Sequence, residues 1–398
     1  MSELSYLEKL MDGVEVEWLP LSKVFNLRNG YTPSKTKKEF WANGDIPWFR
    51  MDDIRENGRI LGNSLQKISS CAVKGGKLFP ENSILISTSA TIGEHALITV
   101  PHLANQRFTC LALKESYADC FDIKFLFYYC FSLAEWCRKN TTMSSFASVD
   151  MDGFKKFLIP RPCPDNPEKS LAIQSEIVRI LDKFTALTAE LTAELTAELN
   201  MRKKQYNYYR DQLLNLEGRE NTREMRIGDI YDFQYGTGNT IPKSGGQYPV
   251  YGSNGIVGSH DKYNSEDSPV IGHIGAYAGI VNWGQGKHFV TYNGVICRHK
   301  SKEVLQKYAY YLLLLQDFGS KSNSASQPFV SYNILNAPIV LVPPLQEQAR
   351  IVAILDKFDT LTNSITEGLP REIELRQKQY EYYRDLLFSF PKPETVSN

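Results

Sequence analysis

The feature that most constrains this fold is a long segment that occurs twice in the chain. The stretch IVRILDKFTALT begins at residue 177 and IVAILDKFDTLT at residue 351, while RKKQYNYYRD at 202 matches RQKQYEYYRD at 376. Both pairs are offset by 174 residues, so residues 177–214 and 351–388 align without a gap. A repeat of this kind indicates an architecture built from two similar halves.

Both copies are expected to be amphipathic helices, because their apolar residues recur with i, i+3, i+4 spacing. In the first copy these residues are Ile173, Ile177, Ile180, Leu181, Phe184, Leu187, Leu191 and Leu195. In the second copy they are Ile351, Ile354, Leu355, Phe358 and Leu361. Pro370 is expected to kink or break the second helix.

The segments between the helical copies also resemble each other. LSKVFNLRNG at 21–30 aligns with IGDIYDFQYG at 227–236, and each block ends on a proline-bearing exit, FLIPRP or PIVLVPP. The opening YLEKLMDGVEVEW resembles LLNLEGRE, where the first helical copy ends. The order block, helix, block, helix therefore predicts a pseudo-two-fold, circularly organised chain whose two helices form an antiparallel coiled coil.

Each block predicts a mixed domain, with strand-like runs such as SILIS at 83–87 and PVIGHIG at 269–275 and helices at 122–139 and 302–318. We therefore predict the α+β class, with two globular mixed α/β domains joined by two long helices. The predicted boundaries are 1–13 for an N-terminal segment completing the helical region, 14–165 for the first domain, 166–218 for the central helical spacer, 219–343 for the second domain and 344–398 for the C-terminal helical spacer.

Three tandem copies of TAEL occupy residues 188–199. Ala, Leu and Glu favour helix, and one four-residue unit lengthens a helix by about 6 Å. Because a base pair rises about 3.4 Å, one unit would shift two DNA-reading domains by roughly one to two base pairs. The alternative is a harmless helix extension left by repeat slippage.

The chain is neutral, with 45 Lys+Arg and 45 Asp+Glu, although both blocks are weakly basic, at 19 against 15 in 14–162 and 9 against 7 in 225–343. Their loops carry cationic, amide and hydroxyl side chains suited to phosphates and base edges. For any one residue, an ordinary solvated loop is the alternative. The candidate DNA-contacting residues are Tyr31, Lys35, Lys37, Lys38, Arg50, Ser87, Thr88, Asn105, Gln106 and Arg107 in the first block, and Lys243, Tyr251, Ser253, Asn254, Tyr292, Asn293, Ser324 and Gln327 in the second.

The helical copies carry a second set of candidates. Phe184 and Tyr209 are expected to pack between the helices, whereas Tyr206, Tyr208 and Arg210 are candidates for a partner-docking face. The alternative is that all of them belong to the coiled-coil core. The candidate coiled-coil and partner-contacting residues are Phe184, Leu187, Leu191, Leu195, Tyr206, Tyr209, Arg210, Phe358, Tyr380, Tyr383 and Arg384.

Several enzyme classes lack support in the sequence. There is no GxxxxGK[ST] phosphate loop and no HExxH, and the Pro-Pro pair in VPPL lacks the polar and aromatic neighbours of an adenine methyltransferase motif. The seven cysteines form no CxxC pair, which favours reduced thiols in the cytoplasm over disulfides or zinc. No apolar run is long enough to span a membrane.

Together these features resemble the specificity (S) subunit of type I restriction–modification enzymes. The resemblance rests on the paired ILDKF…QYxYYRD copies at 180–211 and 354–385, the exits IPRP…AIQSEIV and VPPLQEQARIV, and YPVYGSNGIVG at 248–258. The TAEL repeats look like those of the IC subgroup. The second copy lacks TAEL, so any role in spacing rests on the first helix.

The resemblance implies a non-catalytic subunit whose two target recognition domains read the halves of a split site on double-stranded DNA. It also implies that the helical spacers hold the domains apart and dock two modification (methyltransferase) subunits, and that restriction subunits join the complex. S-adenosylmethionine, ATP and Mg²⁺ are then expected on the partners, with no cofactor or metal on this chain.

Two rival functions remain open from the sequence. A coiled-coil scaffold with two ligand-binding domains and no DNA role would make a DNA gap length irrelevant. A lone methyltransferase or nuclease would show turnover by the purified chain, which the missing motifs argue against.

Overall fold

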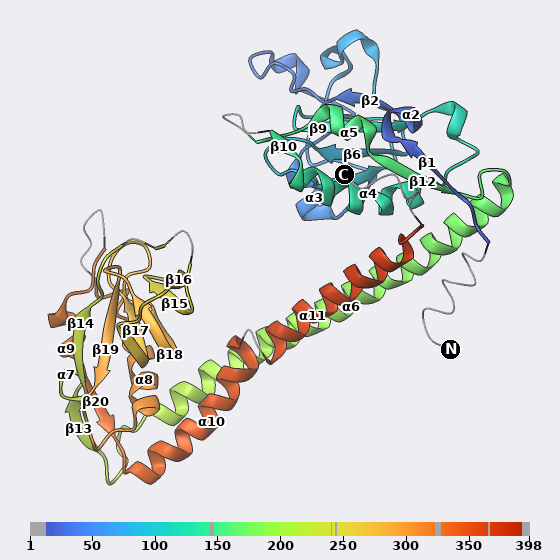
Figure 1. Cartoon of the computed structure of the whole chain (residues 1–398). Coiled ribbons are helices and arrows are strands. Elements are labelled where there is room, and N and C mark those ends of the chain that lie inside the picture. The colour runs from blue at the N-terminus through green and yellow to red at the C-terminus, as the bar shows by residue number, and fades with distance from the viewer. Residues whose placement is uncertain are drawn as a thin grey trace. The chain divides into compact units, whose positions relative to one another are not determined.

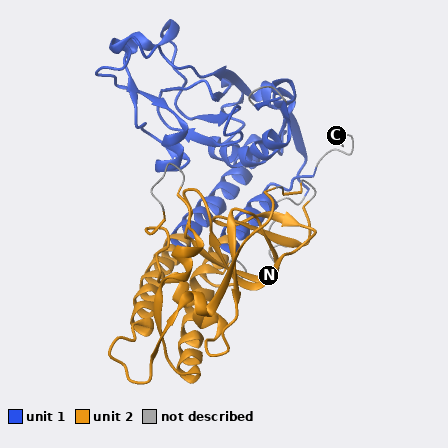
Figure 2. Ribbon diagram, turned by 90° about the vertical axis from the view of Figure 1, so that its left-hand side faces the viewer, with its two compact units in different colours: residues 1–191, 375–398 blue, residues 192–374 orange. Residues whose placement is uncertain are grey.

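The computed structural model describes residues 13–142, 147–239, 241–242, 245–322, 328–364 and 367–391, so most of the predicted N-terminal segment lies outside it. The chain divides into two compact units, residues 1–191 with 375–398 and residues 192–374 (Figure 2). Each unit contains one α+β domain together with part of the helical segments (Figure 1).

The domain of the first unit combines short strands with α-helices and 3₁₀ helices. Its elements are β1 (Val16–Pro20), α2 (Leu21–Val24), β2 (Phe25–Asn29), η1 (Lys38–Phe40), β3 (Ile46–Phe49), α3 (Met51–Asn57), β4 (Ile60–Leu61), β5 (Lys67–Ile68), η2 (Ser70–Ala72), η3 (Lys74–Gly76), β6 (Ser83–Ser87), β7 (His95–Ile98), β8 (Leu103–Ala104), β9 (Phe108–Leu113), η4 (Glu115–Tyr117), α4 (Ile123–Lys139), β10 (Thr141–Thr142), β11 (Ser148–Val149), α5 (Met151–Lys156) and β12 (Leu158–Pro162).

A five-stranded sheet with the order β2-β9-β6-β7-β4 forms the centre of this domain. Strand β6 is apolar along almost its whole length because both faces of the sheet are covered. Side chains alternate between the faces of a strand, so Ile84 and Ile86 join the core against α4, whereas Leu85 joins the core with Trp48 of β3. A second sheet, β5-β3-β8, supports that opposite side.

The domain of the second unit has longer strands and fewer helices. Its elements are β13 (Arg223–Arg226), α7 (Ile227–Ile230), β14 (Tyr231–Tyr235), β15 (Tyr248–Gly252), β16 (Gly255–His260), β17 (Ser265–Gly272), β18 (Val281–Val290), β19 (Gly294–His299), α8 (Gln306–Leu314), α9 (Tyr332–Asn336) and β20 (Ile339–Val342). Its six-stranded sheet has the order β14-β19-β17-β18-β15-β16. The predicted helix at 302–318 is thus shorter, and the predicted strand at 269–275 ends at Gly272.

The two domains share a common frame, as the alignment of 21–30 with 227–236 predicts. In each domain the first strand pairs with the last, β1 with β12 and β13 with β20. The first strand is followed by a four-residue helix and then by an edge strand of the main sheet. The predicted sequence echo between the blocks is therefore confirmed by their strand pairing.

The helical segments are α6 (Pro167–Leu214), α10 (Leu345–Asn363) and α11 (Leu369–Leu387). The break in the second copy is confirmed, since α10 ends at Asn363 and Pro370 lies in the first turn of α11, where its missing N–H costs nothing. Gly368 adopts a φ of 83° immediately before that turn. By contrast, α6 is continuous through the TAEL repeats.

Near the start of α6 and of α10, the apolar stripe packs into the core of the adjacent domain. Ile177 and Leu181 are fully buried in the core that also contains α4, and Ile351 and Leu355 are fully buried in the corresponding core of the second unit. Leu187 is 51% exposed, so it does not continue a buried seam as predicted. Leu191 and Leu195, which lie within the TAEL repeats, are half-buried.

Equivalent glutamines bind each helix to its domain. The Oε1 atom of buried Gln174 accepts a hydrogen bond from Asp122 N at 2.9 Å, and that of buried Gln348 accepts one from Leu305 N at 2.8 Å. Each amide nitrogen donates to the carbonyl two residues earlier in the same loop. These side chains satisfy buried backbone groups, so the docking of helix on domain is specific as well as apolar.

A tyrosine–aspartate pair repeats this docking about two turns further along each helix. The hydroxyl of Tyr128 donates to Asp182 Oδ1 at 2.8 Å, and that of Tyr311 donates to Asp356 Oδ1 at 2.5 Å. Burial, and then the hydrogen bond to the carboxylate, raises the pKa of both tyrosines, so both remain neutral donors at physiological pH.

The end of each helical copy inserts into a domain core. Phe388 and Phe390, just after α11, pack on Phe125 of α4 with ring centroids 5.3 and 6.1 Å away. At the equivalent positions of the first copy, Leu214 and Leu216 are buried in the second unit. The circular organisation predicted from the sequence thus has a direct counterpart in the first unit, whose core is completed by the last described residues of the chain.

Replacing Phe388 by Ala is expected to lower the free energy of unfolding of the first unit by about 3–5 kcal/mol, because it removes a buried aromatic side chain. Phe388→Leu, which installs the residue found at position 214, should cost less than half as much. Urea unfolding of the full chain followed by fluorescence reports this, since Trp18 Nε1 donates to Pro391 O at 3.1 Å. Unfolding of the Ala variant at the wild-type urea concentration would contradict this account of the core.

Candidate nucleic-acid interface

One turn recurs in the same place in both domains. In the first unit Gly30 N donates to Phe108 O at 2.9 Å and Tyr31 N donates to Ala104 O at 2.8 Å. In the second unit Gly236 N donates to Gly294 O at 2.9 Å, and the following N–H, that of residue 237, donates to Val290 O at 3.1 Å. The candidate residues Asn105, Gln106 and Arg107 of the first block and Tyr292 and Asn293 of the second therefore lie in equivalent turns.

The two glycines make this arrangement possible. A Cβ atom on Gly30 would lie 2.1 Å from Asn105 O, and one on Gly236 would lie 2.2 Å from Thr291 O. Both obstacles are backbone atoms, which cannot move aside as a side chain can. Glycine is required at both positions because the edge strand and the turn approach within backbone contact.

We define residues 105–107 as the first reading turn and residues 291–293 as the second. Gln106 and Arg107 are exposed, Tyr292 is 46% exposed and Asn293 is half-buried. Amide side chains pair with adenine and Arg with guanine in the major groove. The turns therefore present different polar side chains on the same backbone frame.

Other predicted residues of the first unit shape this surface. Asn105 Oδ1 accepts from Arg107 N at 3.0 Å and so holds the turn, while Thr32 Oγ1 donates to Gln106 Oε1 at 2.5 Å. Tyr31 is half-buried and its hydroxyl donates to Ala72 O at 3.1 Å. Its role in the fold is thus to anchor the loop that follows Gly30.

The three predicted lysines of that loop, Lys35, Lys37 and Lys38, are exposed. Lys35 and Lys38 line a hollow of about 440 Å³ together with Trp41. Arg50 instead turns inward, with an ion pair to Asp52 at 3.7 Å and its Nε atom buried. The lysines therefore remain available to phosphates, whereas Arg50 is partly engaged within the protein.

Two predicted contact residues are buried and lack the exposed surface that DNA contact requires. Ser87 is fully buried at the end of β6, where its hydroxyl donates to Ser89 O at 3.0 Å. Tyr251 is buried in β15, and its hydroxyl donates to Trp283 O at 3.2 Å. In both cases a polar group that seemed free in the sequence satisfies a local backbone carbonyl. Thr88 is half-buried beside Thr109, with the two hydroxyls 3.1 Å apart.

The remaining candidates lie in the second unit. Asn254 is exposed and Ser253 half-buried in the tight turn between β15 and β16. Lys243, Ser324 and Gln327 lie outside the described residues.

An aromatic stack beside the second reading turn was not found from the sequence. Tyr235 lies between His273 and Tyr332, with ring centroids 4.1 and 4.2 Å away and nearly parallel planes. His273 N donates to Asn293 O at 2.8 Å, which ties the stack to the turn. No sequence signal joins these rings, because they come from three separate segments.

The helical candidates separate into buried and exposed positions. Tyr206 and Tyr380 are buried. Tyr209 stacks on Phe358 at 5.6 Å in the second unit. The sequence predicts that Phe184 packs between the helices. In the first unit the ring of Phe184, on α6, lies 5.5 Å from that of Tyr383, on α11.

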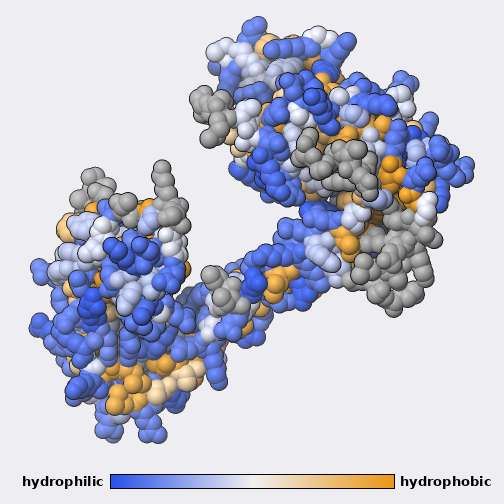
Figure 3. Space-filling view, viewed as in Figure 1, coloured by the Kyte–Doolittle hydropathy of each residue, from blue (hydrophilic) through white to orange (hydrophobic). Residues whose placement is uncertain are grey.

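Two equivalent tyrosines on the same helical copies face solvent. Tyr208 is 61% exposed and Tyr382 is 63% exposed. Arg210 and Arg384 each pair with the aspartate that follows them, at 2.8 and 2.7 Å. The helical segments are mostly hydrophilic on the face shown in Figure 3.

Metal and membrane chemistry have no site in the part of the chain that the structure describes. Within it, no three His, Cys, Asp or Glu residues come together as metal ligands, and no helix is both long and apolar enough to cross a bilayer. All seven cysteines are free thiols.

Comparison with known proteins agrees with this geometry. Residues 13–201 and 219–375 match the family described as type I restriction modification DNA specificity domain. The chain belongs to that family. Two separate matches in one chain also agree with the internal repeat.

Relatives in the type I specificity family are similar over nearly the whole chain. The specificity subunit of the type I restriction enzyme EcoprrI from Escherichia coli is 69% identical over 92% of this chain and 93% of its own. That of EcoR124I/EcoR124II from the same species is 39% identical over the full length of both. A solved chain from a study of complex assembly and conformational transition of the type I R-M system shares the fold, with a TM-score of 0.61, 16% identity and coverage of 94% and 97%.

Proposed function

We propose that this chain is the non-catalytic subunit that gives a type I restriction–modification complex its DNA sequence specificity. The observation that carries the proposal is the pair of equivalent reading turns, built on the same glycine-dependent frame but with different side chains. Each domain would read one half of a bipartite site on double-stranded DNA, as the family's description suggests. A scaffold with no DNA role would have no need for exposed Gln106 and Arg107 in one turn and Tyr292 and Asn293 in the other.

The proposed target recognition domains are residues 14–165 and 219–343, with the helical segments as spacers. In this proposal the two helical copies form an antiparallel coiled coil. The ring contacts of Phe184 with Tyr383 and of Tyr209 with Phe358 support it within each unit. The docking of Gln174 would fix the first domain on its own helix, so that the orientation of the reading turn follows the helix.

The proposed partners are two modification subunits and the restriction subunits that join through them, acting in the cytoplasm. Two copies of one partner need two similar docking faces, and the repeated exposure of Tyr208 and Tyr382 supports such faces. ATP and Mg²⁺ would be bound by the partners, because the chain carries no phosphate-loop motif, and S-adenosylmethionine likewise, because the chain carries no adenine methyltransferase motif.

The TAEL repeats suggest the IC-like subgroup and a spacer whose length sets the gap between half-sites. Continuity of α6 from Pro167 to Leu214 supports this role, because an unbroken helix transmits an added length along its axis. The division of the second copy into α10, which ends at Asn363, and α11, which begins at Leu369, supports it as well, since two separate helices tolerate a changed length more easily than one continuous helix does.

The test is to map methylated adenines by single-molecule sequencing in cells that express the chain with its cognate modification subunit. The wild type is expected to give one bipartite motif. Deletion of Thr192 to Leu195 is expected to keep both half-sites and shorten the gap by one or two base pairs, because it removes about 6 Å of helix.

The two parts of the proposal fail separately in this experiment. An unchanged gap in the deletion would reduce TAEL to a tolerated insertion and leave the specificity role intact. Absence of any motif that depends on this chain would overturn the DNA-reading role and favour the scaffold.

Replacing Tyr208 or Tyr382 by Ala is expected to weaken binding of one of the two modification subunits at least tenfold, since exposed tyrosines are frequent interface anchors. Mass measurement of the purified complex should show loss of one partner in each single variant and of both in the double variant.

A matched control is Tyr277→Ala, which removes an exposed tyrosine of the second recognition domain from outside the helical copies. Full retention of two partners by the double variant would show that docking does not use this face.

A further inference from the structure

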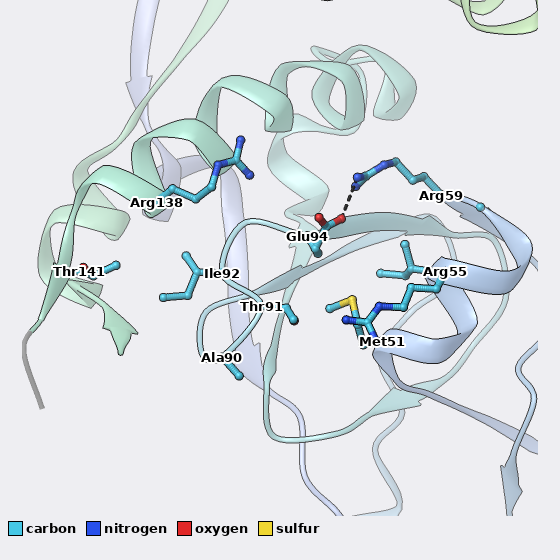
Figure 4. Close-up of a pocket in the computed structure, with 11 residues that line it drawn as sticks. Met51, Arg55, Arg59, Ala90, Thr91, Ile92, Glu94, Arg138 and Thr141 are labelled. Carbon is cyan, nitrogen blue, oxygen red and sulfur yellow. Dashed lines mark hydrogen bonds and ion pairs between the residues drawn. The ribbon is translucent and has the colours of Figure 1, made fainter. Parts of the chain in front are cut away.

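A basic pocket in the first unit is unexplained by the reading turns. It has a volume of about 660 Å³ and lies between α3, the loop before β7 and the end of α4. Figure 4 shows Arg138 on one side of the loop and Arg55 and Arg59 on the other. The remaining lining residues are Met51, Ile54, Gly58, Ala90, Thr91, Ile92, Glu94 and Thr141.

The charge of this lining is strongly asymmetric, with three arginines and a single acid. Glu94 neutralises Arg59, whose Nη2 lies 2.7 Å from the carboxylate and whose Nη1 donates to His95 O at 3.0 Å. Arg55 and Arg138 are exposed, and neither makes an ion pair within the described part of the chain. Two guanidinium groups are therefore left without a counter-ion at the rim of one cavity.

The loop that forms the pocket wall is held in an uncommon backbone conformation. Ala90 has a φ of 63°, which is rare for a residue with a side chain, and Gly93 has a φ of 88°. A Cβ atom on Gly93 would lie 2.8 Å from both Ala134 O and Arg138 Nη1. Buried Ser87 secures the loop, because its carbonyl accepts from Gly93 N at 2.9 Å and its N–H donates to Glu94 O at 2.7 Å. The wall is thus a preformed feature of the fold.

Hydrogen bonds link the first reading turn to two segments that lead to the pocket. Thr88, which begins the pocket loop, donates its N–H to Arg107 O at 2.9 Å, and Phe49, next to α3, accepts from Asn105 N at 3.1 Å. Both ends of the reading turn are therefore bonded to segments that lead directly into the pocket lining. A duplex that presents a base edge to Gln106 and Arg107 also presents its phosphates to the adjoining surface.

We propose that this pocket binds a phosphodiester of the DNA backbone through Arg55 and Arg138 and so fixes the first recognition domain in register on the duplex. The inference rests on the proposed function. Guanidinium groups bind phosphate oxygens with fork geometry, and phosphate contacts position a protein without carrying sequence information. Arg59 is paired with Glu94, so in this proposal it forms part of the pocket wall and does not bind the phosphate.

The test uses the full chain in complex with its modification subunits and a fluorescent duplex that carries its mapped motif. The slope of log K against log salt concentration is negative, and removing two phosphate contacts reduces its magnitude by about 1.8. The double variant Arg55→Gln with Arg138→Gln is therefore expected to show this lower slope, at least about tenfold weaker binding at 0.15 M salt, and an unchanged methylation motif.

The matched control is Lys23→Gln with Lys156→Gln, which removes two exposed positive charges on α2 and α5, outside the pocket lining. It should leave the slope nearly unchanged. Glu94→Gln supplies a test in the other direction, because release of Arg59 is expected to strengthen binding and steepen the slope.

Unchanged affinity and slope in the arginine variant, with wild-type thermal unfolding, would overturn the inference. Thermal unfolding in sodium phosphate separates the two possible sources of the anion. If wild type is stabilised by phosphate relative to chloride and the variant is not, while the DNA slope stays the same, the pocket serves free phosphate and the DNA assignment is wrong. Failure of the wild-type complex to prefer its motif over a scrambled duplex would instead overturn the proposed function.

Discussion

The burial of each helix against its own domain is the constraint on which the rest of the structure depends. Ile177 and Leu181 lie in the core of the first domain, and Gln174 satisfies backbone groups of a loop in that domain. Ile351, Leu355 and Gln348 do the same in the second. Apolar burial provides the stability and the buried hydrogen bonds provide the register, because a slipped helix would leave these amides and backbone groups unpaired.

Each docked domain has two parts, a backbone frame that both domains share and turns whose side chains differ between them. The frame consists of the entry–exit strand pair, the short helix and the edge strand that ends at Gly30 or Gly236, and it is nearly the same in both domains. The two equivalent bonds that attach each turn to that frame run between backbone groups, so they do not depend on which side chains the turn carries. In a domain of this design the side chains of the turn can change without changing how the domain folds.

The sequence predicted the periodic and repeated features well. The 174-residue repeat predicted both helical segments, and Pro370 predicted the break, because these features depend on local propensity. The equivalent turns were selected from their polar composition, although their equivalence was not recognised. Ser87 and Tyr251 were misjudged because hydroxyl groups in a loop-like sequence can equally satisfy buried carbonyls, and this depends on strand placement.

The basic pocket and the aromatic stack were beyond sequence reasoning for a different reason. Arg55, Arg59 and Arg138 come from separate elements, and only the close approach permitted by Gly93 brings α4 to the loop before β7. The burial of Ile177 and Leu181 in the core of the first domain was also not predicted, because a helical stripe does not reveal whether a helix or a domain covers it.

The most direct test of the central claim, that each reading turn specifies its own half of the site, is a methylation map of one altered turn. In the complete complex, Gln106→Ala with Arg107→Ala should relax or change one half-site and leave the other half-site and the gap as in wild type. Tyr292→Ala with Asn293→Ala should affect only the opposite half. A map in which either variant alters both halves, or neither, while the complex remains assembled, would contradict the account.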